Sequence, residues 1–204
     1  MNSKRSPEAR EYFRRGGWSR SGVEKDTGPM IEAVLIGVAA GGLKALGELL
    51  PLFYLNPGFA VIIVQHRQDN CGFELIDILS RVCQRPVKEA QQLEVVRPGV
   101  IYIAPGGYHL LVEGDQTFSL SNDTPVNYAR PSIDAFFESA AAVYEDRLVG
   151  IILTGANADG AAGLAAIKRA GGLTVVQEPA IAEAPSMPRE AIRASRVDHV
   201  LPLR

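Results

Sequence analysis

The sequence has few cysteines, two among 204 residues, and no long apolar run. No segment approaches the 18 or so consecutive apolar residues that a membrane helix needs, and the N-terminal segment lacks the apolar stretch of a signal peptide. Cys71 and Cys83 fall in one predicted helix, where twelve steps of about 1.5 Å separate them by roughly 18 Å, too far for a disulfide. We therefore expect a cytoplasmic protein with reduced cysteines and no membrane insertion.

A strong excess of charge of either sign is also missing, since the net charge is −2. The chain therefore lacks the overall positive charge that is typical of nucleic-acid-binding proteins, and we do not expect nucleic acid as a partner. The charge is unevenly placed, however, at +3 over residues 1–30 and −5 over residues 31–204. The first segment is polar, basic and too poor in apolar residues to offset its ordering entropy, so we expect a mostly disordered tail. Residues 31–204 are predicted to form one globular domain.

Apolar runs alternate with helical patterns along the domain, which is typical of an α/β fold. The apolar runs predict buried strands over residues 33–38, 59–65, 100–104, 148–153 and 173–177. The helical patterns lie over residues 43–53, 73–82, 132–144, 161–170 and 188–194, with Ser132 as an N-cap and Asp134 in the first turn. Alternating segments at 109–113 and 117–120 predict an antiparallel hairpin at a sheet edge. We expect a doubly wound, mostly parallel sheet flanked by helices on both faces.

Three places follow the predicted strands directly, where α/β sheets bind their ligands. They are the turn at 37–42, the histidine His66, and the loop at 154–160 that contains Asp159. If those strands are neighbours, position 39, His66 and Asp159 converge in the order nucleophile, base and carboxylate. Position 39 is an alanine, so the nucleophile is missing. Taken singly, His66 is a polar residue ending a strand and Asp159 an N-cap of the helix that follows it.

The glycine turn also fits a phosphate-binding interpretation. Gly37-x-Ala39-x-x-Gly42 is a variant of the dinucleotide fingerprint, and it would account for the alanine. That fingerprint expects an acidic residue about 20 positions further on, near the end of the second strand. The chain has Val64-Gln65-His66-Arg67 there, so dinucleotide binding is the weaker alternative.

Six short motifs together resemble the CheB family of chemotaxis methylesterases. They occur in the family's order over residues 31–202. The segments are Leu35–Gly42, which resembles Ile-Gly-x-Ser-x-Gly-Gly, then Val64–His66, Ile103–His109, Arg130–Asp134, Leu153–Gly160 and Ser186–Ala191. The resemblance covers the catalytic domain only, and no receiver domain precedes it in this sequence. We accordingly expect no control through phosphorylation of a receiver of its own.

The resemblance implies hydrolysis of glutamyl methyl esters, and in some members deamidation of glutamine, on the cytoplasmic helices of methyl-accepting chemoreceptors. It assigns the serine position to Ala39, the base to His66 and the orienting carboxylate to Asp159. It implies neither metal nor cofactor, and it places His109 near the site, where a purely structural role stays open. The implied oxyanion donors and turn residues are Ala40, Gly41, Gly42 and Ala156.

Two departures from the family pattern lie within the predicted site. Asn157-Ala158 stand where the family more often has glycine after position 156. Ala39 is either an engineered replacement of serine or the mark of a natural pseudoenzyme, and the intact partners favour replacement. Since loss of a triad serine costs on the order of 10⁶ in kcat, we expect the chain as written to be inactive. A chemoreceptor-binding module without chemistry is the alternative.

Overall fold

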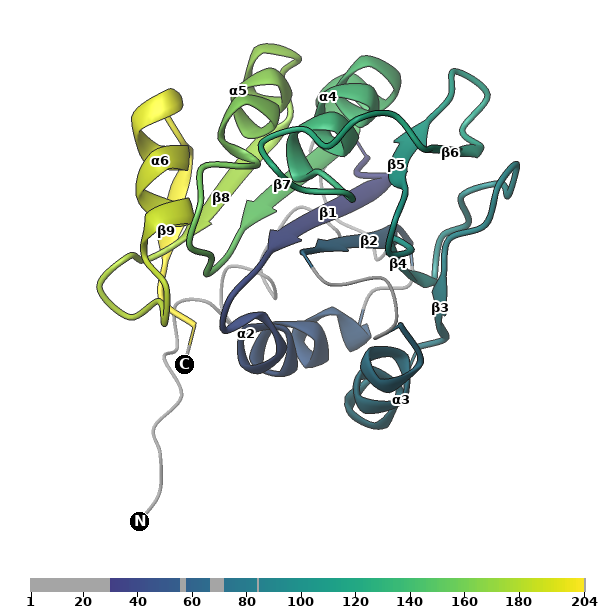
Figure 1. Cartoon of the computed structure of the whole chain (residues 1–204), viewed down its shortest axis with the longest axis horizontal. Helices are drawn as coiled ribbons and strands as arrows, with labels where there is room; N and C mark the ends of the chain where they lie inside the picture. Colours follow the sequence, from purple (N-terminus) through teal and green to yellow (C-terminus); the bar gives the residue numbers. More distant parts are fainter. Residues whose placement is uncertain (1–29, 56–57, 67–71, 84, 204) are drawn as a thin grey trace, which may run out of the picture.

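The computed structural model describes residues 30–55, 58–66, 72–83 and 85–203. Its main feature is a seven-stranded sheet in the order β3-β4-β2-β1-β7-β8-β9, in which every pair is parallel (Figure 1). The strands are β1 (Ala33–Val38), β2 (Ala60–Gln65), β3 (Val87–Glu89), β4 (Ile101–Ile103), β7 (Leu148–Ile152), β8 (Leu173–Gln177) and β9 (His199–Leu201). The prediction of a doubly wound parallel sheet is confirmed.

Helices cover both faces of this sheet, which explains why the central strands are apolar throughout (Figure 1). One face carries α2 (Gly42–Leu49) and α3 (Gly72–Val82), and the other carries α4 (Ile133–Tyr144), α5 (Ala161–Arg169) and α6 (Ser186–Ala194). Successive strand side chains point to opposite faces, so Leu35 joins the core under α4 while Ile36 joins the core under α2. Burying both faces fixes the strand register.

The predicted hairpin exists as β5 (His109–Val112) and β6 (Phe118–Ser121), paired antiparallel. The prediction that this hairpin lies at an edge of the main sheet is wrong, because β5 and β6 form a separate two-stranded sheet. The outer edge of β4 is already paired with β3. The hairpin packs instead on α4, where the Val112 N–H donates to Ser139 Oγ at 3.1 Å.

Other differences from the predictions concern short or interrupted elements. The helix expected over 43–53 ends at Leu49 and continues as a 3₁₀ helix over Leu50–Leu55, because Pro51 lacks the N–H that an α-helix requires. Strands β3 and β9 were not predicted. Cys83 follows α3 as a free thiol, whereas Cys71 and residues 1–29 lie outside the described residues. Within the described part, no helix is long and apolar enough to cross a membrane.

Candidate active site

The turn after β1 brings position 39 to the carboxyl end of the central strand. The Ala39 N–H donates to Thr154 O at 3.0 Å, which ties the turn to the loop after β7. Gly41 is the N-cap of α2 with φ of 77°, a conformation that favours glycine. A Cβ there would also lie 2.8 Å from the Cβ of Glu183. Backbone conformation and available space therefore both require glycine at this point of the turn.

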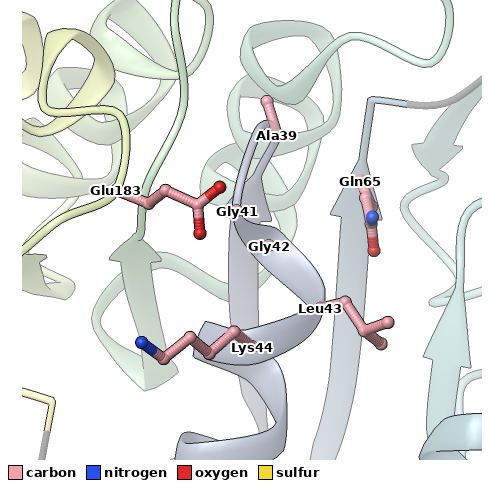
Figure 2. A pocket seen from close by; sticks show the side chains of 7 residues that line it. All are labelled: Ala39, Gly41, Gly42, Leu43, Lys44, Gln65 and Glu183. Atoms are coloured by element: carbon pink, nitrogen blue, oxygen red, sulfur yellow. The ribbon is translucent and has the colours of Figure 1, made fainter.

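An open pocket of about 470 Å³ begins at this turn and runs along the first residues of α2 (Figure 2). Figure 2 shows Gln65 of β2 on one side of the turn and the carboxylate of Glu183 on the other. The lining residues are Ala39, Gly41, Gly42, Leu43, Lys44, Gln65 and Glu183. Because Ala39 lines this open pocket and is itself only partly buried, a side chain at position 39 would be reachable from solvent.

The sheet topology places His66 beside this turn. Strands β1 and β2 pair in register up to Val38 and Gln65, and the His66 N–H donates to Val38 O at 3.0 Å. The imidazole is nearly buried, and its Nε2 lies 2.6 Å from Asp159 Oδ2. Asp159 comes from the loop after β7, the other neighbour of β1. The structure thus brings together all three positions that the sequence predicted to converge.

Asp159 is fully buried and accepts hydrogen bonds from five donors. Oδ2 accepts from His66 Nε2 and the Ile133 N–H, and Oδ1 accepts from Ser132 Oγ, the Asp134 N–H and Asn127 Nδ2, all within 3.2 Å. Burial alone would raise the pKa of this carboxyl group, but the hydrogen bonds from His66, Ile133, Asn127 and Ser132 outweigh it and lower the pKa. Asp159 is therefore an anion held in one orientation.

The alternative interpretation of Asp159 as an N-cap of the helix that follows it is wrong. Gly160 is the N-cap of α5 and makes no side-chain cap, while the Asp159 carboxylate binds the first amides of α4. Asp134 of α4 does the converse, since its Oδ1 accepts from Gly160 N at 2.9 Å and Gly163 N at 2.7 Å. Asp134 on α4 thus satisfies amides at the start of α5, and Asp159, in the loop just before α5, satisfies the first amides of α4. Burial raises the pKa of Asp134, and the nearby Asp159 charge adds to the effect.

Two asparagines complete the site: Asn127, which the sequence analysis did not single out, and Asn157, which it noted only as a departure from the family pattern. Asn127 Nδ2 donates to both carboxylates, at 2.8 Å to Asp134 and 3.2 Å to Asp159. Asn157 Oδ1 accepts the Asp159 N–H at 3.2 Å, and its Nδ2 lies 3.2 Å from His66 Nδ1. Both lie in loops, and their partners are up to 91 residues away, so no local sequence pattern identifies them.

The remaining predicted residues divide into structural and solvent-facing ones. His109 is buried, accepts the Ser132 N–H at Nδ1 and contacts Thr124 O through Nε2, so it fixes the start of α4. The Gly42 N–H donates to Ala39 O within the turn and is not free for a ligand. Ala40 and Ala156 are exposed. Among the described residues, no group of three or more His, Cys, Asp or Glu could hold a metal ion.

Comparison with known proteins agrees with this geometry. The family model for CheB methylesterase matches residues 34–204. A putative protein-glutamate methylesterase/protein-glutamine glutaminase of Leptospira interrogans is 51% identical over 172 residues, 84% of this chain and 89% of that protein. A protein-glutamate methylesterase/protein-glutamine glutaminase of Symbiobacterium thermophilum is 36% identical over 83% of this chain, but the match spans only 47% of that protein's length.

A solved structure gives the same result for the fold. The catalytic domain of the CheB methylesterase of Thermotoga maritima superimposes with a TM-score of 0.81 and 31% sequence identity, covering 85% of this chain and 93% of that domain. These matches favour the esterase interpretation of the glycine turn over dinucleotide binding. With nearly the whole described domain matched by both sequence and structure, the chain belongs to the CheB methylesterase family.

Proposed function

We propose that this chain is a protein-glutamate methylesterase domain whose chemistry is silenced by the alanine at position 39. The observation that carries the proposal is the 2.6 Å contact between His66 Nε2 and Asp159, built at the end of the strand next to position 39. A base oriented by a buried carboxylate is the arrangement that activates a hydroxyl nucleophile in hydrolases. The substrates are glutamyl methyl esters on the cytoplasmic helices of chemoreceptors, and glutamine side chains as a second class.

The reaction follows from the positions of these groups. A serine hydroxyl at position 39 would attack the ester carbonyl and give its proton to His66. Because Nε2 faces Asp159, Nδ1 is the ring nitrogen that would take this proton and return it to the departing methanol. Water would then hydrolyse the acyl-enzyme with the same histidine as base. The N–H groups of Ala40 and Ala156, for which the described residues provide no acceptor, would stabilise the oxyanion.

The test is the variant Ala39→Ser, assayed for methanol release from a methylated receptor and for hydrolysis of an activated ester. We expect a gain of at least about 10³-fold in kcat over the unchanged chain, since a triad serine contributes on the order of 10⁶. Ala40→Ser is a matched control, because it places the same hydroxyl one residue away on the exposed turn. Equal rates for the two folded variants would refute the proposal.

The second candidate function is receptor binding without chemistry, and the methyl group of Ala39 is the observation that favours it. A chain that binds receptor helices without releasing methanol would shield modified glutamates from other enzymes. We expect the unchanged chain to bind a cytoplasmic receptor fragment in calorimetry, with an unrelated coiled coil of similar charge as the control. Failure to bind the receptor fragment more tightly than the control would eliminate this candidate.

A further inference from the structure

The side-chain amide of Asn157 has only one orientation that satisfies its neighbours. The Asp159 N–H can only donate, so the atom 3.2 Å from it must be the amide oxygen of Asn157. The amide nitrogen consequently faces His66 Nδ1, also at 3.2 Å. An amide nitrogen can only donate, so Nδ1 must present its lone pair.

This orientation also fixes the proton on the other ring nitrogen. A neutral imidazole with a lone pair on Nδ1 carries its proton on Nε2, which then donates to the Asp159 carboxylate at 2.6 Å. Three groups are thereby closed into one ring of hydrogen bonds, from the Asp159 backbone through Asn157 and His66 to the Asp159 side chain. Both nitrogens of the imidazole are occupied.

We propose that Asn157 is a positioning residue that holds His66 in the Nε2–H tautomer and occupies the Nδ1 lone pair. The consequence for catalysis rests on the proposed function. The lone pair lies in the ring plane and accepts one well-aligned hydrogen bond, so a hydroxyl at position 39 would have to displace the Asn157 amide before His66 could act as its base. Two features therefore keep the site inactive: position 39 lacks a hydroxyl group, and the lone pair of His66 Nδ1 already accepts a hydrogen bond from Asn157.

The first test is nitrogen NMR of the ¹⁵N-labelled chain, in which only three histidines contribute imidazole signals and His66→Gln assigns the relevant one. We expect a protonated Nε2 and an unprotonated Nδ1 shifted by hydrogen bonding. Asn157→Ala should move the Nδ1 resonance toward that of a free lone pair, while the exposed control Asn122→Ala should leave it unchanged. An Nδ1–H tautomer, or an Nδ1 resonance that ignores Asn157→Ala, would overturn the proposal.

A second variant guards against an effect on loop folding. Asn157→Asp keeps an oxygen for the Asp159 N–H but turns an acceptor toward Nδ1. It should therefore favour a proton on Nδ1 and shift that resonance in the direction opposite to Asn157→Ala. Shifts of the same sign in both variants would indicate a loop rearrangement and contradict the proposed lock.

Kinetics in the Ala39→Ser background separate this inference from the proposed function. Adding Asn157→Ala should raise kcat by roughly three- to tenfold, the factor expected for release of one neutral hydrogen bond, and adding Asn122→Ala should not. If Ala39→Ser is active and Asn157→Ala brings no gain, the competition is refuted. If every variant is inactive while the NMR pattern holds, the hydrolase proposal fails and the tautomer assignment stands.

Discussion

Replacing Asp159 by asparagine tests whether this carboxylate supports the fold as well as the site. Oδ2 accepts two hydrogen bonds and Oδ1 accepts three, and all the donors are held by secondary structure or by short loops. An amide offers one oxygen only. Whichever oxygen becomes the NH₂ group, at least two buried donors then face another donor.

The magnitude follows from the number of donors left unsatisfied. Each buried donor without an acceptor costs about 1–3 kcal/mol, so two of them give a loss of about 3 kcal/mol in the free energy of unfolding. For a domain of this size the corresponding fall in melting temperature is roughly 6–12 °C. Urea unfolding followed by circular dichroism measures the first quantity, and a thermal scan measures the second.

The control for this variant is Asp77→Asn, which removes an exposed carboxylate paired with Arg81 one helical turn away. A surface pair of this kind contributes about 0–1 kcal/mol, so we expect a change within about 0.5 kcal/mol. A loss below 1 kcal/mol for Asp159→Asn, or one equal to that of the control, would refute the argument that five donors depend on this carboxylate.

The contribution of Asp159 to the free energy of unfolding should depend on pH. The hydrogen bonds hold the pKa of Asp159 below its ordinary value of 3.8, so ionised Asp159 stabilises the folded state. That contribution is fully present above the unfolded value and is lost as the pH falls through the lower folded pKa. The stability difference between the unchanged chain and Asp159→Asn should therefore shrink as the pH falls below about 4. A difference that grows on acidification would contradict it.

Three further outcomes follow from the packing. Gly163→Ala should lower the free energy of unfolding by about 1–3 kcal/mol, because the added Cβ would lie 2.5 Å from the Cβ of Phe137. Gly47→Ala is the control: its added Cβ would have no atom within 4 Å, so it should stabilise α2 by up to about 1 kcal/mol. Ser132→Ala removes the N-cap of α4 and one donor to the buried carboxylate, so urea unfolding should detect a loss of about 1–2 kcal/mol. Burial raises the pKa of the Cys83 thiol, and peptide mass spectrometry should accordingly find its alkylation at pH 7 slower than that of a free cysteine peptide.

The sequence was sufficient for the central strands and for the positions they carry. Strands β1, β2 and β7 are continuous apolar runs, and parallel strands share one carboxyl edge, so Ala39, His66 and Asp159 could be grouped without coordinates. The three-residue strands β3 and β9 escaped prediction, because each reads as part of a loop unless its neighbour in the sheet is known. Their pairing is a tertiary effect.

The contacts of the site were less predictable than its location. Asp159 reads locally as the cap of the helix after it, but Gly160 adopts the left-handed conformation, with φ of 97°, and the carboxylate binds α4 instead. Asn127 and Asn157 each bond to one residue far away in the sequence, Asp159 and His66 respectively, so spacing along the chain does not predict these contacts. Their roles depend on how the loops approach one another in space.

The exchange of carboxylates between α4 and α5 changes how members of this family should be sorted into active and inactive proteins. Because Asp159 satisfies the first amides of α4, a lineage that stops using the enzyme would still lose folded protein if it lost this residue. Selection for abundance alone would then preserve it. Retention of the aspartate is therefore uninformative about turnover, and under the proposed mechanism it is the identity at positions 39 and 157 that would separate working esterases from silent relatives.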